Sequence, residues 1–137
     1  MHHIENLFQS HPHTAGAENA NLAKLIRSLD ECKESCTACA DACLAEPKPE
    51  MLRRCIRLNL DCADSCTAAA RILSRLTEPD GDILRSHVEA CAIACRLCGD
   101  ECRKHETHHD HCRICAESCR QCEQACRQYA KSLGVTV

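Results

Sequence analysis

The spacing of the cysteines constrains this chain more than any other feature. One segment places them at Cys91, Cys95, Cys98 and Cys102, in steps of four, three and four residues. Residues at this spacing share one face of an α-helix. The segment is therefore predicted to be a helix with one face made of thiols.

The same stripe recurs in three other segments and accounts for all 16 cysteines. The other members are Cys32, Cys36, Cys39 and Cys43; Cys55, Cys62 and Cys66, with Asn59 at the fourth position; and Cys112, Cys115, Cys119, Cys122 and Cys126. Leu, Ile, Val and Phe supply only 24 of the 137 residues, which borders on the composition of disordered proteins. A folded core therefore has to include the cysteines.

Four long helices with short connections are expected. They run from residue 19 to the Glu46-Pro47-Lys48-Pro49 segment and over residues 49–77, 82–106 and 110–133, with Gly134 as a stop. This pattern predicts an all-α fold, an antiparallel up-down-up-down four-helix bundle with a cysteine-lined core. The bundle domain is expected over residues 19–137. Residues 1–18 form an N-terminal extension, in which Ile4, Leu7 and Phe8 suit a short helix.

An antiparallel arrangement sorts the stripes by height. One end of the bundle, the leucine end, is expected to be a dry plug made of Leu22, Leu25, Leu29, Leu73, Leu76, Leu84, Val88, Tyr129 and Leu133. The opposite end, the histidine end, is expected to be an opening lined by Cys43, Met51, Leu52, His105, His108, His109 and His111. Thiol, thioether and imidazole groups are soft or borderline metal ligands, so metal ions are expected to enter there.

Composition excludes several classes of function. The net charge is −3 and there is one Tyr and one Phe, so neither a basic patch nor an aromatic platform for nucleic acid is expected. The first 13 residues hold no apolar run long enough for a signal peptide, and no stretch suits a membrane span. We therefore expect a cytoplasmic protein without a membrane partner. Thiols stay reduced there, which favours metal binding over disulfides.

Cu(I) is the metal that best fits a continuous lining of thiols. It is soft, accepts two or three thiolates, and lets one thiolate bridge two ions, which gives a capacity of about one ion per cysteine. Zinc prefers separate four-ligand sites, and iron–sulfur clusters prefer cysteines on loops. A zinc reservoir remains an alternative, and a purely structural role for so many cysteines is disfavoured because Leu fills a core equally well.

The chain resembles the cytosolic bacterial copper storage proteins. The repeated C-x-x-x-C-x-x-C-x-x-x-C stripes and the His-rich connection between Cys102 and Cys112 carry this resemblance over residues 19–134. It implies a copper-binding bundle domain that stores multiple Cu(I) ions per chain, protects the cytosol from copper and holds a reserve. It also implies a homotetramer, uptake at the histidine end, and a supplementary ligand role for Asn59 and His87. It identifies no copper donor or acceptor protein.

Two motifs favour other functions. His105-Glu106-Thr107-His108-His109 satisfies the H-E-x-x-H pattern of zinc peptidases, but it lies where a helix meets a loop. Cys112-x-x-Cys115 lies near a helix N-terminus, where a redox-active thiol would be placed, yet a thiol–disulfide enzyme leaves the other cysteines unexplained. We therefore expect no enzymatic activity. His105, His108, His109 and His111 are instead predicted metal ligands, whereas Met51 is expected in the core.

Overall fold

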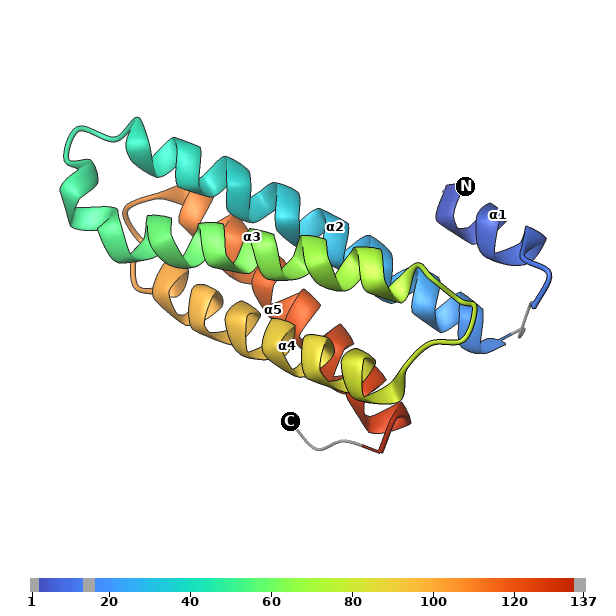
Figure 1. Ribbon diagram of the computed structural model, residues 1–137. Coiled ribbons are helices and arrows are strands. Elements are labelled where there is room, and N and C mark those ends of the chain that lie inside the picture. The colour runs from blue at the N-terminus through green and yellow to red at the C-terminus, as the bar shows by residue number, and fades with distance from the viewer. Residues whose placement is uncertain (1–2, 14–16, 135–137) are drawn as a thin grey trace.

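The computed structural model describes residues 3–13 and 17–134, and in that part of the chain every regular element is a helix (Figure 1). The elements are α1 (His3–Ser10), α2 (Ala17–Leu44), the 3₁₀ helix η1 (Pro49–Leu52), α3 (Arg53–Leu73), α4 (Gly81–Arg103) and α5 (Asp110–Ser132). Residues 1–2 and 14–16 of the predicted N-terminal extension lie outside the described residues. None of the described helices is long and apolar enough to cross a membrane.

The four long helices form the predicted antiparallel bundle. Each packs against two neighbours, in the cyclic order α2, α3, α4, α5 and back to α2. The connections from α2 to α3 and from α4 to α5 lie at one end, and the connection from α3 to α4 lies at the other (Figure 1). The all-α, up-down-up-down prediction is therefore confirmed.

The helix ends follow local chemistry. Pro49 opens η1, which leads into α3, because proline lacks the amide hydrogen that a helix interior needs. Asp80 caps α4 by accepting hydrogen bonds from the backbone amides of Asp82 and Ile83, at 3.0 and 3.1 Å. After α5, Gly134 has φ of 79°, the left-handed conformation expected of a helix stop.

Two predicted helices are shorter than expected. α3 ends at Leu73 instead of residue 77, and α4 ends at Arg103 instead of residue 106. The connection after α3 contains Glu78 with φ of 51° directly before Pro79, a backbone conformation that no helix can include. Residues 104–108 form turns, so His105 and His109 lie on a connection at the histidine end.

Small residues let the helices approach closely. Buried alanines flank the cysteines on all four long helices, among them Ala40, Ala63, Ala92 and Ala116. At Gly99 on α4, an added Cβ would lie only 3.3 Å from the Cβ of Cys119 on α5. Helices that approach this closely bring short cysteine side chains to the bundle axis.

The leucine end is less tightly closed than the sequence predicted. Leu22, Leu25 and Leu73 are buried, but Leu84 and Tyr129 are only partly buried. All five side chains line a cavity of about 660 Å³ that opens to solvent. The prediction of a dry plug is therefore wrong at the rim of this end, whereas Leu29 and Val88 are buried as expected.

Helix α1 lies beside α2 near the leucine end (Figure 1). Phe8 is buried, and Glu5 pairs with Arg27 of α2 at 2.8 Å. His11, just beyond α1, lies 3.2 Å from the Thr77 hydroxyl in the connection from α3 to α4. The N-terminal histidines that the structure describes therefore lie far from the histidine end.

Candidate metal-binding core

Every cysteine points into the bundle. All 16 are free thiols, and none is more than 2% exposed. Each helix supplies its sulfurs from one face because the steps of three and four residues match the helical repeat. The core between the two ends is therefore lined by thiols from four directions.

The sulfur atoms meet across the bundle axis as well as between neighbouring helices. Cys36 on α2 and Cys98 on α4 have Sγ atoms 3.9 Å apart, and Cys66 on α3 and Cys122 on α5 have theirs 4.0 Å apart. Shorter separations include 3.5 Å for Cys55–Cys102, 3.6 Å for Cys36–Cys119 and 3.7 Å for both Cys62–Cys95 and Cys66–Cys91. These distances exceed the roughly 2.05 Å of a disulfide, and one metal ion with metal–sulfur bonds of about 2.3 Å spans them.

Several groups of ligand atoms lie within 4.8 Å of one another. They include three groups of four thiols: Cys32, Cys66, Cys95 and Cys122; Cys32, Cys36, Cys62 and Cys119; and Cys36, Cys98, Cys115 and Cys119. Cys32, Cys36 and Cys119 each belong to two of these groups, so the groups are linked through shared sulfurs. Such an array suits a metal that accepts bridging thiolates better than one that needs separate sites.

Asn59 is fully buried among the thiols. Its Oδ1 accepts hydrogen bonds from the thiols of Cys98 and Cys115, at 3.0 and 3.1 Å. Its Nδ2 lies 3.6 Å from the Cys55 sulfur. The amide therefore occupies the position of a fourth cysteine in the α3 stripe and connects that stripe to those of α4 and α5.

Replacing Asn59 by Ala is expected to lower the free energy of unfolding of the copper-free protein by about 1–3 kcal/mol. The substitution removes an acceptor shared by the thiols of Cys98, Cys102 and Cys115 and leaves a small cavity in the core. Urea unfolding under reducing, anaerobic conditions measures the change. Gln121→Ala, at an exposed position of α5, is the control and should shift the free energy by less than about 0.5 kcal/mol. Equal stability of the two variants would contradict a structural role for Asn59.

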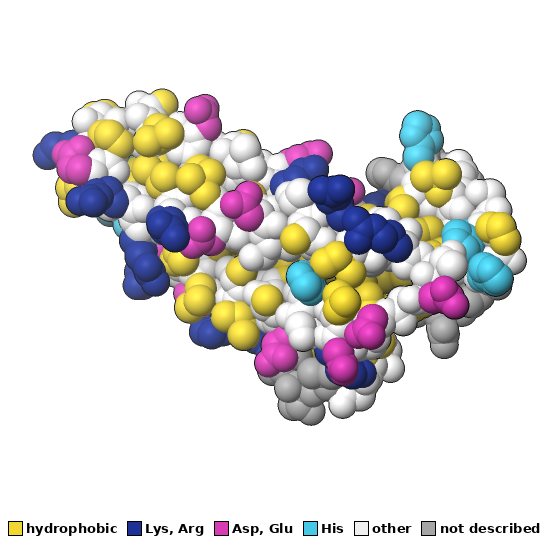
Figure 2. All heavy atoms as spheres, in the orientation of Figure 1, with side chains coloured by type: hydrophobic (Ala, Val, Ile, Leu, Met, Phe, Trp, Pro, Cys, Tyr) yellow, Lys and Arg dark blue, Asp and Glu magenta, His cyan; other side chains and the backbone are white. Residues whose placement is uncertain are grey.

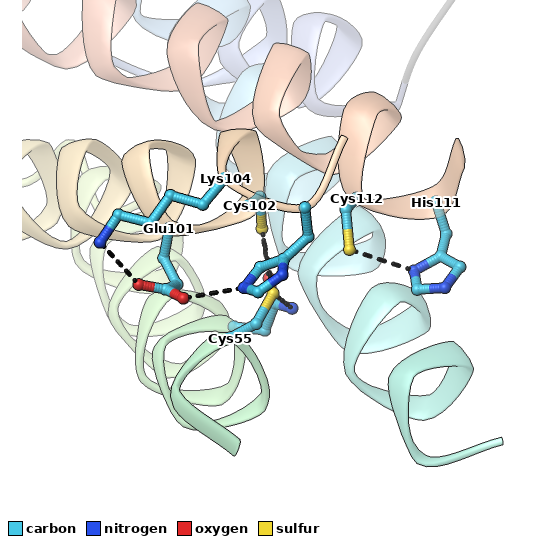
Figure 3. A network of polar contacts seen from close by, with 8 residues as sticks. Cys55, Glu101, Cys102, Lys104, His111 and Cys112 are labelled. Atoms are coloured by element: carbon cyan, nitrogen blue, oxygen red, sulfur yellow. Dashed lines mark hydrogen bonds and ion pairs between the residues drawn. The ribbon is translucent and has the colours of Figure 1, made fainter. Parts of the chain in front are cut away.

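Three of the predicted histidine ligands lie together at the histidine end. His105, His109 and His111 are each about three-quarters buried at the side chain. Nδ1 of His111 lies 3.4 Å from the Cys39 sulfur and 3.6 Å from the Cys112 sulfur. Figure 3 shows His111 and Cys112 on one side of the contact network and Glu101 and Lys104 on the other. His111 is therefore the imidazole that continues the sulfur lining.

Two carboxylates at this end were not predicted from the sequence. Glu46 accepts hydrogen bonds from Nε2 of His111 at 2.8 Å and from Nδ1 of His109 at 2.9 Å. Glu101 accepts one from Nε2 of His105 at 3.0 Å. The antiparallel topology places the connections from α2 to α3 and from α4 to α5 side by side at this end. A contact between Glu46, which precedes Pro47, and the His-rich connection could therefore have been predicted.

The groups at the histidine end differ in acidity. A hydrogen bond from Cys102 contributes most to lowering the pKa of Cys39 to about 6, and Cys55 and His111 add to it. Burial raises the pKa of Cys43 to about 11 and also raises the pKa of Cys112. Burial lowers the pKa of His111, but hydrogen bonds with Cys39 and Glu46 outweigh it and raise that pKa overall. Among these three cysteines, Cys39 is therefore the one whose pKa is lowered.

The structure does not bring the other predicted ligands to the thiols. His87 is exposed on α4, and its Nδ1 lies 3.0 Å from the backbone carbonyl of Ile83. His108 is exposed on the connection from α4 to α5. Met51 is 70% exposed on η1, so the expectation that it packs in the core is wrong. η1 turns its buried Leu52 inward instead, because a 3₁₀ turn does not keep the α-helical register.

The geometry disfavours the two enzyme alternatives. A redox-active thiol has to be accessible, but both cysteines of the C-x-x-C candidate are buried, and burial raises the pKa of Cys112, the one nearer the helix N-terminus. The H-E-x-x-H segment lies in turns instead of a helix interior. Its first and last histidines donate to Glu101 and Glu46, so their bonded nitrogens are engaged with carboxylates.

Comparisons with known proteins agree with this geometry. Residues 18–131 match the family model for copper storage proteins. The solved copper storage protein Ccsp from Streptomyces lividans, loaded with 10 copper equivalents, is 46% identical, with a TM-score of 0.90 over 93% of this chain and 98% of that one. The Cu(I)-bound copper storage protein BsCsp3 is 34% identical, with a TM-score of 0.72 over 80% of this chain and 98% of that one.

A curated relative extends the comparison at the level of sequence. The uncharacterized cysteine-rich protein YhjQ of Bacillus subtilis (strain 168) is 36% identical over 91 residues, which are 66% of this chain and 79% of the relative. The similarity extends over most of both proteins.

Proposed function

The chain belongs to the copper storage protein family, and on that premise we propose that it takes up Cu(I) at the histidine end and stores it along the thiol core. The observation that carries the proposal is the linked array of sulfurs, in which neighbouring Sγ atoms are 3.5–4.0 Å apart along the bundle. Each thiolate can bridge two Cu(I) ions, so capacity grows with the number of cysteines and not with the number of closed sites.

Binding solves the electrostatic problem of a buried thiol core. A thiolate away from water is costly, but a bound Cu(I) ion supplies the opposite charge within bonding distance. Each ion that enters releases thiol protons to solvent. All 16 cysteines are ligands in this proposal, and Asn59 supplements them from within the core. Storage then needs no chemistry beyond ligand exchange, and we assign the chain no enzymatic activity.

The histidine end is the proposed route of uptake. Cys39 and His111 meet the incoming ion first, because His111 is partly exposed and its Nδ1 faces the Cys39 sulfur. His105 and His109 lie at the same end and are also partly exposed. His87 and His108 take no part in this proposal, since both side chains are exposed and apart from the thiols.

We propose that the protein is cytosolic and that it forms a homotetramer. A relative described as a cytosolic copper storage protein from Streptomyces lividans is 49% identical, which supports the compartment. Exposed apolar side chains support an assembly, because Leu60 on α3 and Ile93 and Leu97 on α4 are 37–45% exposed. Figure 2 shows hydrophobic side chains gathered in groups between charged ones on one face of the molecule. A surface of this kind suits contact with further copies of the chain.

Cells that lack their own copper defence test the storage function. Producing the chain is expected to raise the copper retained per cell several-fold and to allow growth at copper concentrations that stop control cells. Replacing Cys32, Cys66, Cys95 and Cys122 by serine removes one four-thiol group. This variant should retain less copper, by at least about a quarter, because the capacity follows the number of thiols. His87→Ala is the control and should retain full protection.

The same experiment separates storage from redox chemistry. Under the storage proposal, Cys112→Ser alone removes one thiol of 16 and should reduce retained copper only slightly. Complete loss of protection in Cys112→Ser, together with unchanged protection in the four-serine variant, would contradict storage.

A further inference from the structure

One group of ligand atoms differs from the others in composition. Cys39, Cys43, His111 and Cys112 place three sulfurs and one nitrogen within 4.8 Å of one another at the histidine end. The three cysteines are buried, and the His111 side chain is 25% exposed. This entrance group therefore combines a preformed Cys₃His set with access from solvent.

The imidazole of the entrance group is held in one orientation. Its Nε2 lies 2.8 Å from a Glu46 carboxylate oxygen and donates to it, and Nδ1 faces the sulfurs of Cys39 and Cys112. Metal-bound histidines in proteins commonly donate their second ring nitrogen to a carboxylate, which fixes the tautomer and raises ligand basicity. Glu46 also accepts from His109, whose ring stacks on His111 with centroids 5.4 Å apart. The carboxylate is thus anchored by two imidazoles.

The donor set of this group suits zinc better than Cu(I). Four Cys and His donors in a closed tetrahedron are the usual coordination of structural Zn²⁺, whereas Cu(I) is satisfied by two or three thiolates. The three four-thiol groups named above share cysteines with one another and contain no residue of the entrance group, whereas Cys39 also belongs to a three-thiol group with Cys55 and Cys102. One ion can therefore close this site while those groups stay intact.

We propose that Cys39, Cys43, Cys112 and His111 form a site for a single Zn²⁺ ion, with Glu46 as the residue that positions His111. Binding replaces the thiol protons that remain, up to three per ion, and these protons leave to the solvent. Zinc bound here occupies the first ligands that an incoming Cu(I) ion meets. The site would make the opening of the copper store sensitive to a second, divalent metal.

A zinc titration of the copper-free, reduced protein tests the proposal without any copper chemistry. In competition with a chromophoric zinc chelator, one equivalent should bind at least ten-fold more tightly than the next. His111→Ala should abolish this difference, and Glu46→Gln should weaken the first equivalent by about 10- to 100-fold, the usual cost of losing a carboxylate partner of a ligand. His108→Ala and Glu50→Gln, exposed positions at the same end, are matched controls and should bind as the unaltered protein does.

Cobalt gives an independent readout of the ligand set. The first equivalent of Co²⁺ should produce the intense visible bands of a tetrahedral sulfur–nitrogen site, and His111→Ala should shift them. Several equivalents of zinc with equal affinity would overturn the proposal, because the core groups would then be the sites. A tight first equivalent that is unchanged in His111→Ala would overturn it as well. Neither result would affect the copper proposal, since no copper is present.

Discussion

Filling the core with Cu(I) is expected to raise the midpoint temperature of unfolding by more than about 20 °C. The linked array of thiols exists only in the folded bundle, where sulfurs from α2 and α4 or from α3 and α5 come within 4.0 Å. An ion that bridges them binds the native state in a geometry that the unfolded chain lacks. Each site contributes about 2.7 kcal/mol when free copper exceeds its dissociation constant 100-fold.

A few occupied sites are enough for this effect. Four would contribute about 11 kcal/mol, and for a chain of this length each kcal/mol shifts the midpoint by about 3 °C. Far-ultraviolet circular dichroism of the copper-free and copper-loaded proteins, both anaerobic, measures the shift. A rise below about 5 °C after uptake of ten or more equivalents would indicate that copper binds unfolded or surface sites and not the folded core.

Raising the pH is expected to destabilise the copper-free protein steeply. Burial raises the pKa of Cys43 to about 11 and raises the pKa of Cys112, while hydrogen bonding with Cys122 raises the pKa of Cys126. The unfolded chain has thiols of ordinary pKa, about 8.5. Between these values the unfolded state releases protons that the folded state retains, so stability is complete below about pH 8 and falls as the pH rises towards 11.

The slope of this loss reports the number of thiols involved. Each thiol that stays protonated only in the folded state contributes about 1.4 kcal/mol per pH unit, so three contribute about 4 kcal/mol per unit. Cys39 acts in the opposite sense, because its pKa of about 6 adds stability as the pH rises from 6 to about 8.5. Hydrogen bonds from neighbouring thiols also lower the pKa values of Cys32, Cys62, Cys91 and Cys115, which act in the same sense as Cys39. Stability should therefore be greatest between about pH 7 and 8.5.

Urea unfolding of the reduced protein at pH 7, 8, 9 and 10 measures this dependence. The copper-loaded protein is the control, because its coordinated thiolates have no protons left to release and its stability should not fall over the same range. A free energy of unfolding that stays constant from pH 8 to pH 10 in the copper-free protein would show that the thiols are not buried in their neutral form.

The period of the cysteine stripes predicted most of the fold and of the core. Steps of three and four residues define one face of a helix, and four such faces can meet only around a shared axis. This reasoning predicted that the cysteines lie inside the bundle, and the structure buries them there, as at Cys36, Cys66, Cys98 and Cys119. Prolines and Gly134 indicated where helices end. Asn59 was found because it interrupts a regular stripe, and the structure buries it completely.

Features set by tertiary contacts were not visible in the pattern. Glu46 belongs to no stripe, and its importance arises only when two connections meet at one end of the bundle. His87 lies one position from the seam, and on a helix one position is enough to turn a side chain out to solvent. Met51 is exposed for a related reason. It lies on the 3₁₀ helix η1, whose register differs from that of α3, so Met51 faces solvent while the next residue, Leu52, is buried.

The most direct test of a thiol core built for Cu(I) is an anaerobic titration of the reduced protein, followed by thiolate-to-copper charge-transfer absorption in the near ultraviolet. Because each thiolate can bridge two ions, the absorption should rise linearly to roughly 16 equivalents, and thiols that react with a thiol reagent should disappear in parallel. Saturation near four equivalents, with most thiols still reactive, would contradict a continuous copper-filled core.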